Sequence, residues 1–214
     1  LKEHIEKGVI KGPRIIPSGR VDLDKNTPDN ARAEVRRLAA LGIKFIGEMQ
    51  LAPKPGPTAT QMENLRAIVD ESKKVNVWVQ IHASSPESMM AAVEAGVPKL
   101  VHSPAFGWVT EEQAKKVAAA GVKQLSTVGF GVPVFGVFAN DNKPRFRDGK
   151  PWPEGIIDSE GRGQEAGYKV VNGRTTWDAG VLYGYGTDTN YDPKAGLEHE
   201  LKTLNLMFSM QDII

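Results

Sequence analysis

The sequence predicts an α/β fold, a TIM-type (β/α)8 barrel of which six strand–helix units are present. Two observations support this prediction. Short β-rich runs alternate with helical patterns along the chain, and such alternation is typical of parallel strands joined by right-handed helical crossovers. Several of these runs also end in a histidine or a carboxylate. A barrel gathers the carboxyl ends of its strands at one mouth, whereas an open sheet spreads them along an edge.

The first two units are marked by capping residues. Residues 12–19, "GPRIIPSG", read as a strand, and Thr27 followed by Pro28 opens a helix that ends at Gly42. Residues 43–48, "IKFIGE", form the second strand. Thr60, with Glu63 three residues later, predicts a capping box at the start of the next helix.

The other units follow the same pattern of strand, cap and helix. Further strands are expected at 75–83, 98–104, 122–128 and 180–189. Their helices begin at Ser85 with Pro86, at Thr110 with Gln113, and at Asp192 with Pro193. No composition break divides the chain, so residues 1–214 are expected to form one partial barrel domain.

A full barrel needs eight units in about 250 residues. Six units in 214 residues place two strands outside the sequence, on its N-terminal side. Free strand edges promote aggregation. We therefore expect these edges to pair with further chain or with another copy of the protein, as in a homo-oligomer.

Composition and charge favour a small-molecule partner. The chain has 27 lysines and arginines and 26 aspartates and glutamates, which leaves a net charge of +1. No basic run indicates binding to nucleic acid or to a membrane surface. No apolar window approaches the ~18 residues that cross a bilayer. The chain has no cysteine, so metal chemistry would depend on His, Asp and Glu. The cellular compartment stays open.

Four polar residues stand at the ends of predicted strands. His82 and His102 close two successive strands, Glu48 closes an earlier one, and Asp188 closes the last. Imidazoles and carboxylates without thiolates suit Zn²⁺ or a similar divalent ion. Such an ion makes bound water a usable nucleophile, and Asp188 is the candidate to accept the proton of that water.

Residues 128–163 form the longest irregular stretch. Loops of this length are usually functional lids or disordered segments, and this one is rich in aromatic residues. We expect it to cap the pocket. Arg145 and Arg147 are candidates to bind a substrate carboxylate by paired hydrogen bonds, with surface salt bridges inside the loop as the alternative.

The segments "VQIHA", "LVHSP" and "YGTDT" resemble the amidohydrolase superfamily of metal-dependent hydrolases. The resemblance implies that the chain holds about strands 3 to 8 of the barrel, with His82 ending strand 5, His102 ending strand 6 and Asp188 ending strand 8. It also implies one or two divalent ions. Family members place a carboxylated lysine or a glutamate on strand 4, and of Lys44 and Glu48 we prefer Glu48.

The chain departs from the family pattern at its start. The His-x-His pair of strand 1 is absent from this sequence, so we expect this chain alone to bind metal weakly and to be inactive as an enzyme.

The function implied is hydrolysis of a C–N bond in an amide, a cyclic amide or a dipeptide-like substrate by metal-activated water. Lactonase, phosphotriesterase and deaminase activities use the same kind of site and remain open. The alternative of another class is a barrel domain that binds a small ligand without catalysis, in which the histidines serve only as hydrogen-bonding groups.

Overall fold

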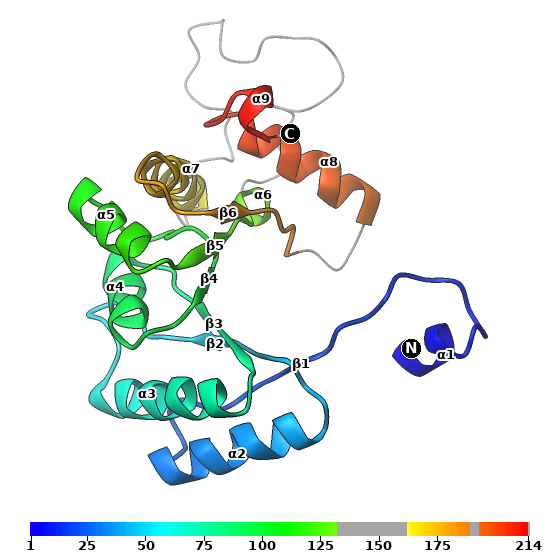
Figure 1. Ribbon diagram of the computed structural model, residues 1–214. Helices are drawn as coiled ribbons and strands as arrows, with labels where there is room; N and C mark the ends of the chain where they lie inside the picture. The colour runs from blue at the N-terminus through cyan, green and yellow to red at the C-terminus, as the bar shows by residue number, and fades with distance from the viewer. Residues whose placement is uncertain (132–161, 189–192, 214) are drawn as a thin grey trace, which may run out of the picture.

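The computed structural model describes residues 1–131, 162–188 and 193–213. Within these ranges the strands form one sheet in the order β1-β2-β3-β4-β5-β6, and every neighbouring pair is parallel (Figure 1). The strands are β1 (Ser18–Gly19), β2 (Phe45–Gln50), β3 (Trp78–His82), β4 (Lys99–Val101), β5 (Lys123–Leu125) and β6 (Tyr183–Gly184). The α/β class and the parallel sheet are therefore confirmed.

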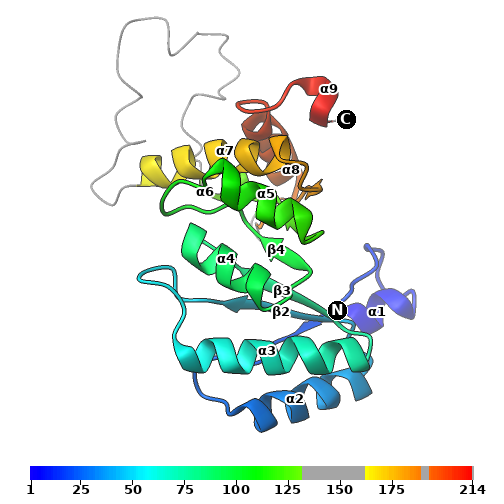
Figure 2. The same cartoon turned by 60° about the vertical axis from the view of Figure 1, so that its left-hand side comes forward.

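Helices connect consecutive strands, and α2 to α5 follow one another along the outer side of the curving sheet (Figures 1 and 2). Their bounds are α1 (Lys2–Glu6), α2 (Pro28–Ala40), α3 (Ala59–Lys74), α4 (Pro86–Glu94), α5 (Glu111–Ala119), α6 (Val128–Gly131), α7 (Arg162–Asp178), α8 (Pro193–Leu204) and α9 (Met210–Ile213). No helix of the described residues has the length and apolar character to cross a membrane.

The hydrophobic core lies between the sheet and these helices. Alternate strand residues such as Val79 and Ile81 of β3 and Leu100 of β4 are buried together with Leu65 and Ile68 of α3. Burying each such side chain contributes about 1.5–3 kcal/mol. Because strand residues alternate between faces, His82 points to the face opposite Ile81, away from the helices.

Most predicted strands are shorter in the structure than in the sequence pattern. The first was expected over residues 12–19, but β1 contains only Ser18 and Gly19. The two prolines of that stretch, Pro13 and Pro17, have no N–H to give to a neighbouring strand. In contrast, β2 continues past Glu48 to Gln50, so Glu48 lies within its strand and does not end it.

The capping box of α3 was predicted at the wrong threonine. Thr58 is the N-cap: its hydroxyl oxygen accepts from the backbone N–H of Gln61, and the Gln61 side chain accepts from the backbone N–H of Thr58. Both Thr58 and Thr60 have a partner of the correct type three residues later. Gln61 also accepts from the backbone N–H of Ala52, a tertiary contact that favours the earlier start.

Replacing Thr58 by alanine is expected to lower the free energy of unfolding by about 1 kcal/mol, the usual effect of losing an N-cap side chain. Thr60→Ala is the matched control and should change stability by less than about 0.5 kcal/mol, because Thr60 is exposed within the first turn. Urea unfolding of both variants measures the difference. A larger loss in Thr60→Ala would restore the original assignment.

The predicted irregular stretch 128–163 is helical at both ends. Its first residues form α6, its last begin α7, and residues 132–161 lie outside the described residues. The helix α7 was not predicted, since Gly167 and Gly173 weaken its helical signal. Arg145, Arg147 and Asp192 also fall outside the described ranges, so the proposed cap and its arginines stay predictions.

Candidate metal site

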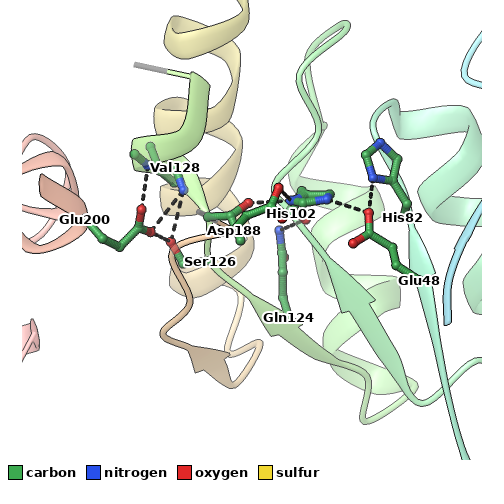
Figure 3. A network of polar contacts seen from close by, with 10 residues as sticks. Glu48, His82, His102, Gln124, Ser126, Val128, Asp188 and Glu200 are labelled. Atoms are coloured by element: carbon green, nitrogen blue, oxygen red, sulfur yellow. Dashed lines mark hydrogen bonds and ion pairs between the residues drawn. The ribbon is translucent and has the colours of Figure 1, made fainter. Parts of the chain in front are cut away.

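Three of the predicted site residues meet at the carboxyl ends of consecutive strands (Figure 3). Glu48 comes from β2, His82 is the last residue of β3, and His102 directly follows β4. The parallel register brings them level, because Gln50 pairs with His82 and His82 pairs with Val101. The sheet therefore places side chains from positions 48, 82 and 102 at one point.

The contacts within this Glu48–His82–His102 cluster are close. One Glu48 carboxylate oxygen, Oε1, contacts Nδ1 of His82 and lies 2.7 Å from Nε2 of His102. The two imidazole rings meet edge to face, with their centroids 4.4 Å apart. One ligand atom from each residue lies within 4.8 Å of the others. Nitrogen and carboxylate donors at this spacing fit a single divalent ion such as Zn²⁺.

The histidines keep Glu48 ionised. Burial by itself raises the pKa of this carboxyl, but hydrogen bonds from His102 and His82 outweigh burial and hold the pKa well below its usual range. A metal ligand must be deprotonated to bind. Glu48 is therefore in the form that a cation requires.

The backbone turns at His102. The φ of this residue is +70°, a left-handed conformation that costs a non-glycine residue about 1–2 kcal/mol. Leu100, two residues earlier, is buried toward the helices, and an undisturbed strand would send His102 to the same face. The left-handed turn instead directs the imidazole to Glu48. Such strain is common at functional sites.

The second ring nitrogen of His102 is held from the opposite side. Nδ1 contacts the hydroxyl of Thr127, which follows β5. For Nε2 to bind a metal, the ring proton must reside on Nδ1, where the Thr127 oxygen can accept it. Metal-binding histidines are commonly oriented in this way by a partner on their other nitrogen. No motif in the sequence indicated Thr127.

Asp188 lies beside the cluster but outside it. Its Oδ2 is 3.9 Å from Nδ1 of His102, and its side chain is 38% exposed. Its φ of +51° is also left-handed. The structure thus brings Asp188 to the Nδ1 side of the His102 ring, where the Thr127 hydroxyl also lies. Its roles as ligand and proton acceptor remain predictions, as do the metal-ligand roles of the other three residues.

Lys44, the alternative strand residue, precedes β2 and is exposed. Since Lys44 lies at the opposite end of the strand from Gln50, its position favours Glu48 as the group available to a metal.

A polar cavity of about 200 Å³ opens at the ends of β1 and β2. Its lining includes Arg20, Asp22, Asp24, Gln50 and Gln61. The carboxylate of Asp22 accepts from two backbone N–H groups, and that of Asp24 accepts from Gln61. Arg20 was not singled out from the sequence, since one arginine after a short strand is no motif.

Comparisons with known proteins place the fold. No family model matches the chain, and no curated protein matches it. Solved structures do match. A Bifidobacterium longum protein assigned as a prolidase is 23% identical, with a TM-score of 0.67, and the match covers 96% of this chain and 53% of that one.

Two further structures agree with this match. One is an amidohydrolase with 20% identity and a TM-score of 0.68, covering 97% of this chain and 56% of that chain. The other is a Xaa-Pro dipeptidase with methionine bound in its active site, with 20% identity and a TM-score of 0.65, covering 96% and 55%.

The chain therefore spans about half the length of the solved structures that it matches. At these identities the likeness concerns the fold. In its fold, this chain is similar to about half of each of these structures, and one of them is an amidohydrolase, in agreement with the sequence resemblance.

Proposed function

We propose that this chain carries part of the metal site of an amidohydrolase-type hydrolase, which cleaves a C–N bond in an amide, a cyclic amide or a dipeptide-like substrate. The observation that supports it best is the Glu48–His82–His102 cluster at the ends of three consecutive parallel strands. Catalytic residues of barrel enzymes stand at these strand ends. In this proposal the described strands are strands 3 to 8 of a (β/α)8 barrel.

The residues present fit a divalent ion, with zinc as the first candidate. Glu48 Oε1, His82 Nδ1 and His102 Nε2 would hold it, and Thr127 would orient His102. When bound, such an ion lowers the pKa of water to about 7 and polarises a carbonyl group. Fewer than four ligands leave a position open, as catalytic zinc sites require.

Two further groups of this chain have places in the proposed reaction. Asp188, beside His102 and partly exposed, would accept the proton of the attacking water and pass it to the leaving nitrogen. Arg20, in the cavity at the ends of β1 and β2, would offer a guanidinium to a substrate carboxylate, the role also proposed for Arg145 and Arg147. The names of the similar structures, a prolidase and a Xaa-Pro dipeptidase, favour a peptide-like bond over a lactone or a phosphotriester.

Zinc binding to the isolated chain tests the proposal. Zinc at about 100 times its Kd should stabilise the protein by about 2.7 kcal/mol, which raises the melting temperature by roughly 5–10 °C for a chain of this size. His82→Ala should abolish most of this rise, because it removes one ligand of the cluster. The matched control His4→Ala removes an exposed imidazole of α1 and should keep the full rise.

Equilibrium dialysis with metal analysis gives the stoichiometry. An equal zinc-induced rise in wild type, His82→Ala and His4→Ala would show that zinc binds elsewhere and would refute the proposed site. A different result would instead favour a ligand-binding domain without catalysis. In that case zinc binds at the cluster, but a longer form of the protein that completes the barrel shows no chelator-sensitive hydrolysis of N-acyl amino acids or dipeptides.

A further inference from the structure

We propose that Glu200 is a positioning residue of the metal site: it fixes the segment 126–129, and through that segment it sets Thr127 against His102. This inference rests on the proposed function, since it concerns the same site. Glu200 itself lies on α8.

The Glu200 carboxylate is buried and fully engaged. Its side chain lies in the interior, and the residue is only 1% exposed. The Ser126 hydroxyl and the Val128 N–H, at 3.0 Å, donate to Oε1, and the Gly129 N–H donates to Oε2 at 2.6 Å (Figure 3). Burying a carboxylate costs several kcal/mol unless donors such as these satisfy it. The residue therefore binds this segment strongly and in one orientation.

The residues that donate to Glu200 flank Thr127 on both sides. Ser126 precedes it and Val128 follows it, and all three residues are buried. The segment also connects directly to the sheet, because the Ser126 N–H donates to the Gly184 carbonyl at 2.6 Å. With both neighbours of Thr127 fixed, its hydroxyl has little freedom to leave Nδ1 of His102.

The His102 ring depends on this contact more than its backbone does. The backbone is held independently, since its N–H donates to the Leu125 carbonyl and its own carbonyl accepts from Gln124. The ring is held at Nε2 by Glu48 and at Nδ1 by the Thr127 hydroxyl. A displaced Thr127 would remove the hydrogen bond at Nδ1 and so weaken the donor that Nε2 offers to a metal.

A double-mutant cycle tests the path from Glu200 to His102. Thr127→Val keeps the side-chain shape, removes the hydroxyl, and should weaken zinc binding about 10–100-fold. Glu200→Gln replaces one carboxylate oxygen by an NH₂ group facing N–H donors, and should weaken zinc binding roughly tenfold. Because Glu200 acts through Thr127, the double variant should bind zinc about as weakly as Thr127→Val alone. The proposal would be overturned if the two losses of zinc affinity multiplied in the double variant, or if Glu200→Gln bound zinc as tightly as wild type.

The matched control is Asn64→Ala. Asn64 is a fully buried polar residue of another helix, α3, which holds the Leu23 and Asn26 carbonyls. Its loss should destabilise the protein yet leave zinc affinity within about twofold of wild type. If Glu200→Gln does not fold, Ser126→Ala serves in its place, because it removes the hydroxyl donor to Glu200 and should weaken zinc binding severalfold. An affinity equal to wild type in folded Ser126→Ala would contradict the path.

A second readout needs no metal. The ¹⁵N resonance of His102 Nδ1 should move in Glu200→Gln in the same direction as in Thr127→Val, and should stay in place in Asn64→Ala. A purely structural role for Glu200 would leave this resonance unchanged. If the wild-type chain binds no zinc, the proposed function fails, while the ¹⁵N comparison still decides whether Glu200 positions His102.

Discussion

Replacing Gly47 by alanine is expected to lower the free energy of unfolding by about 4 kcal/mol or more, in the range that marks an exceptional mutation. Gly47 has a φ of +120°, and a Cβ added there would lie 2.2 Å from the backbone oxygen of Gln80. That φ is essentially confined to glycine, and a strand carbonyl of β3 cannot rotate away. β2 and β3 would have to separate next to Glu48.

Gly167→Ala is the matched control, since nothing lies within 4 Å of an added Cβ in this helix position. Alanine is the better helix former by up to about 1 kcal/mol, so this variant should be as stable as wild type or more stable. Urea unfolding monitored by circular dichroism measures both. Near-wild-type stability of Gly47→Ala would show that the β2–β3 contact at this position is not as close as described.

In a longer form of the protein that completes the barrel, Asp188→Asn is expected to lower kcat about 10³-fold on a peptide-like substrate that the zinc-loaded wild type hydrolyses. Asparagine keeps the size of the side chain but cannot accept a proton, and a positioned general base typically contributes 10²–10⁴-fold. Stability should change little, because the Asp188 side chain is partly exposed and lies in the segment after β6, which ends at Gly184.

Asp178→Asn provides the comparison. Asp178 is also an aspartate near the end of an element, but it forms an exposed ion pair with Arg174 on α7, and such pairs contribute little. The kcat of Asp178→Asn should stay within about twofold of wild type. Equal kcat values for Asp188→Asn and wild type in steady-state assays would remove the proposed role of Asp188.

Local patterns in the sequence were enough for the fold class and for the order of strands and helices. Alternating β-rich and helical segments, with caps such as Ser85 before Pro86, predict parallel strands and crossovers. His82 ends its strand on the face away from the helices, as short-range periodicity predicts. His102 joins it because of the left-handed turn that follows β4, which the periodicity of the sequence does not display.

Competing local signals were harder to resolve. Thr58 and Thr60 both match a capping box, and the contact of Gln61 with Ala52 decided between them. The helix α7 was missed because Gly167 and Gly173 lower its intrinsic propensity. One side chain that helps to hold α7 in place is Asn172, which binds the carbonyls of Pro104 and Gly107, and tertiary contacts of this kind override propensity.

What the sequence alone determined is therefore the alternation, the parallel strands and the candidates Glu48, His82 and His102. Tertiary structure alone decided which groups surround those candidates. Thr127 reaches His102 across 25 residues, and Glu200 reaches Ser126 across 74. No periodicity links positions so far apart, because their contact depends on how the chain folds back from α8 onto the end of β5. The orientation of His102 depends on such contacts and is set only when the whole sheet has formed.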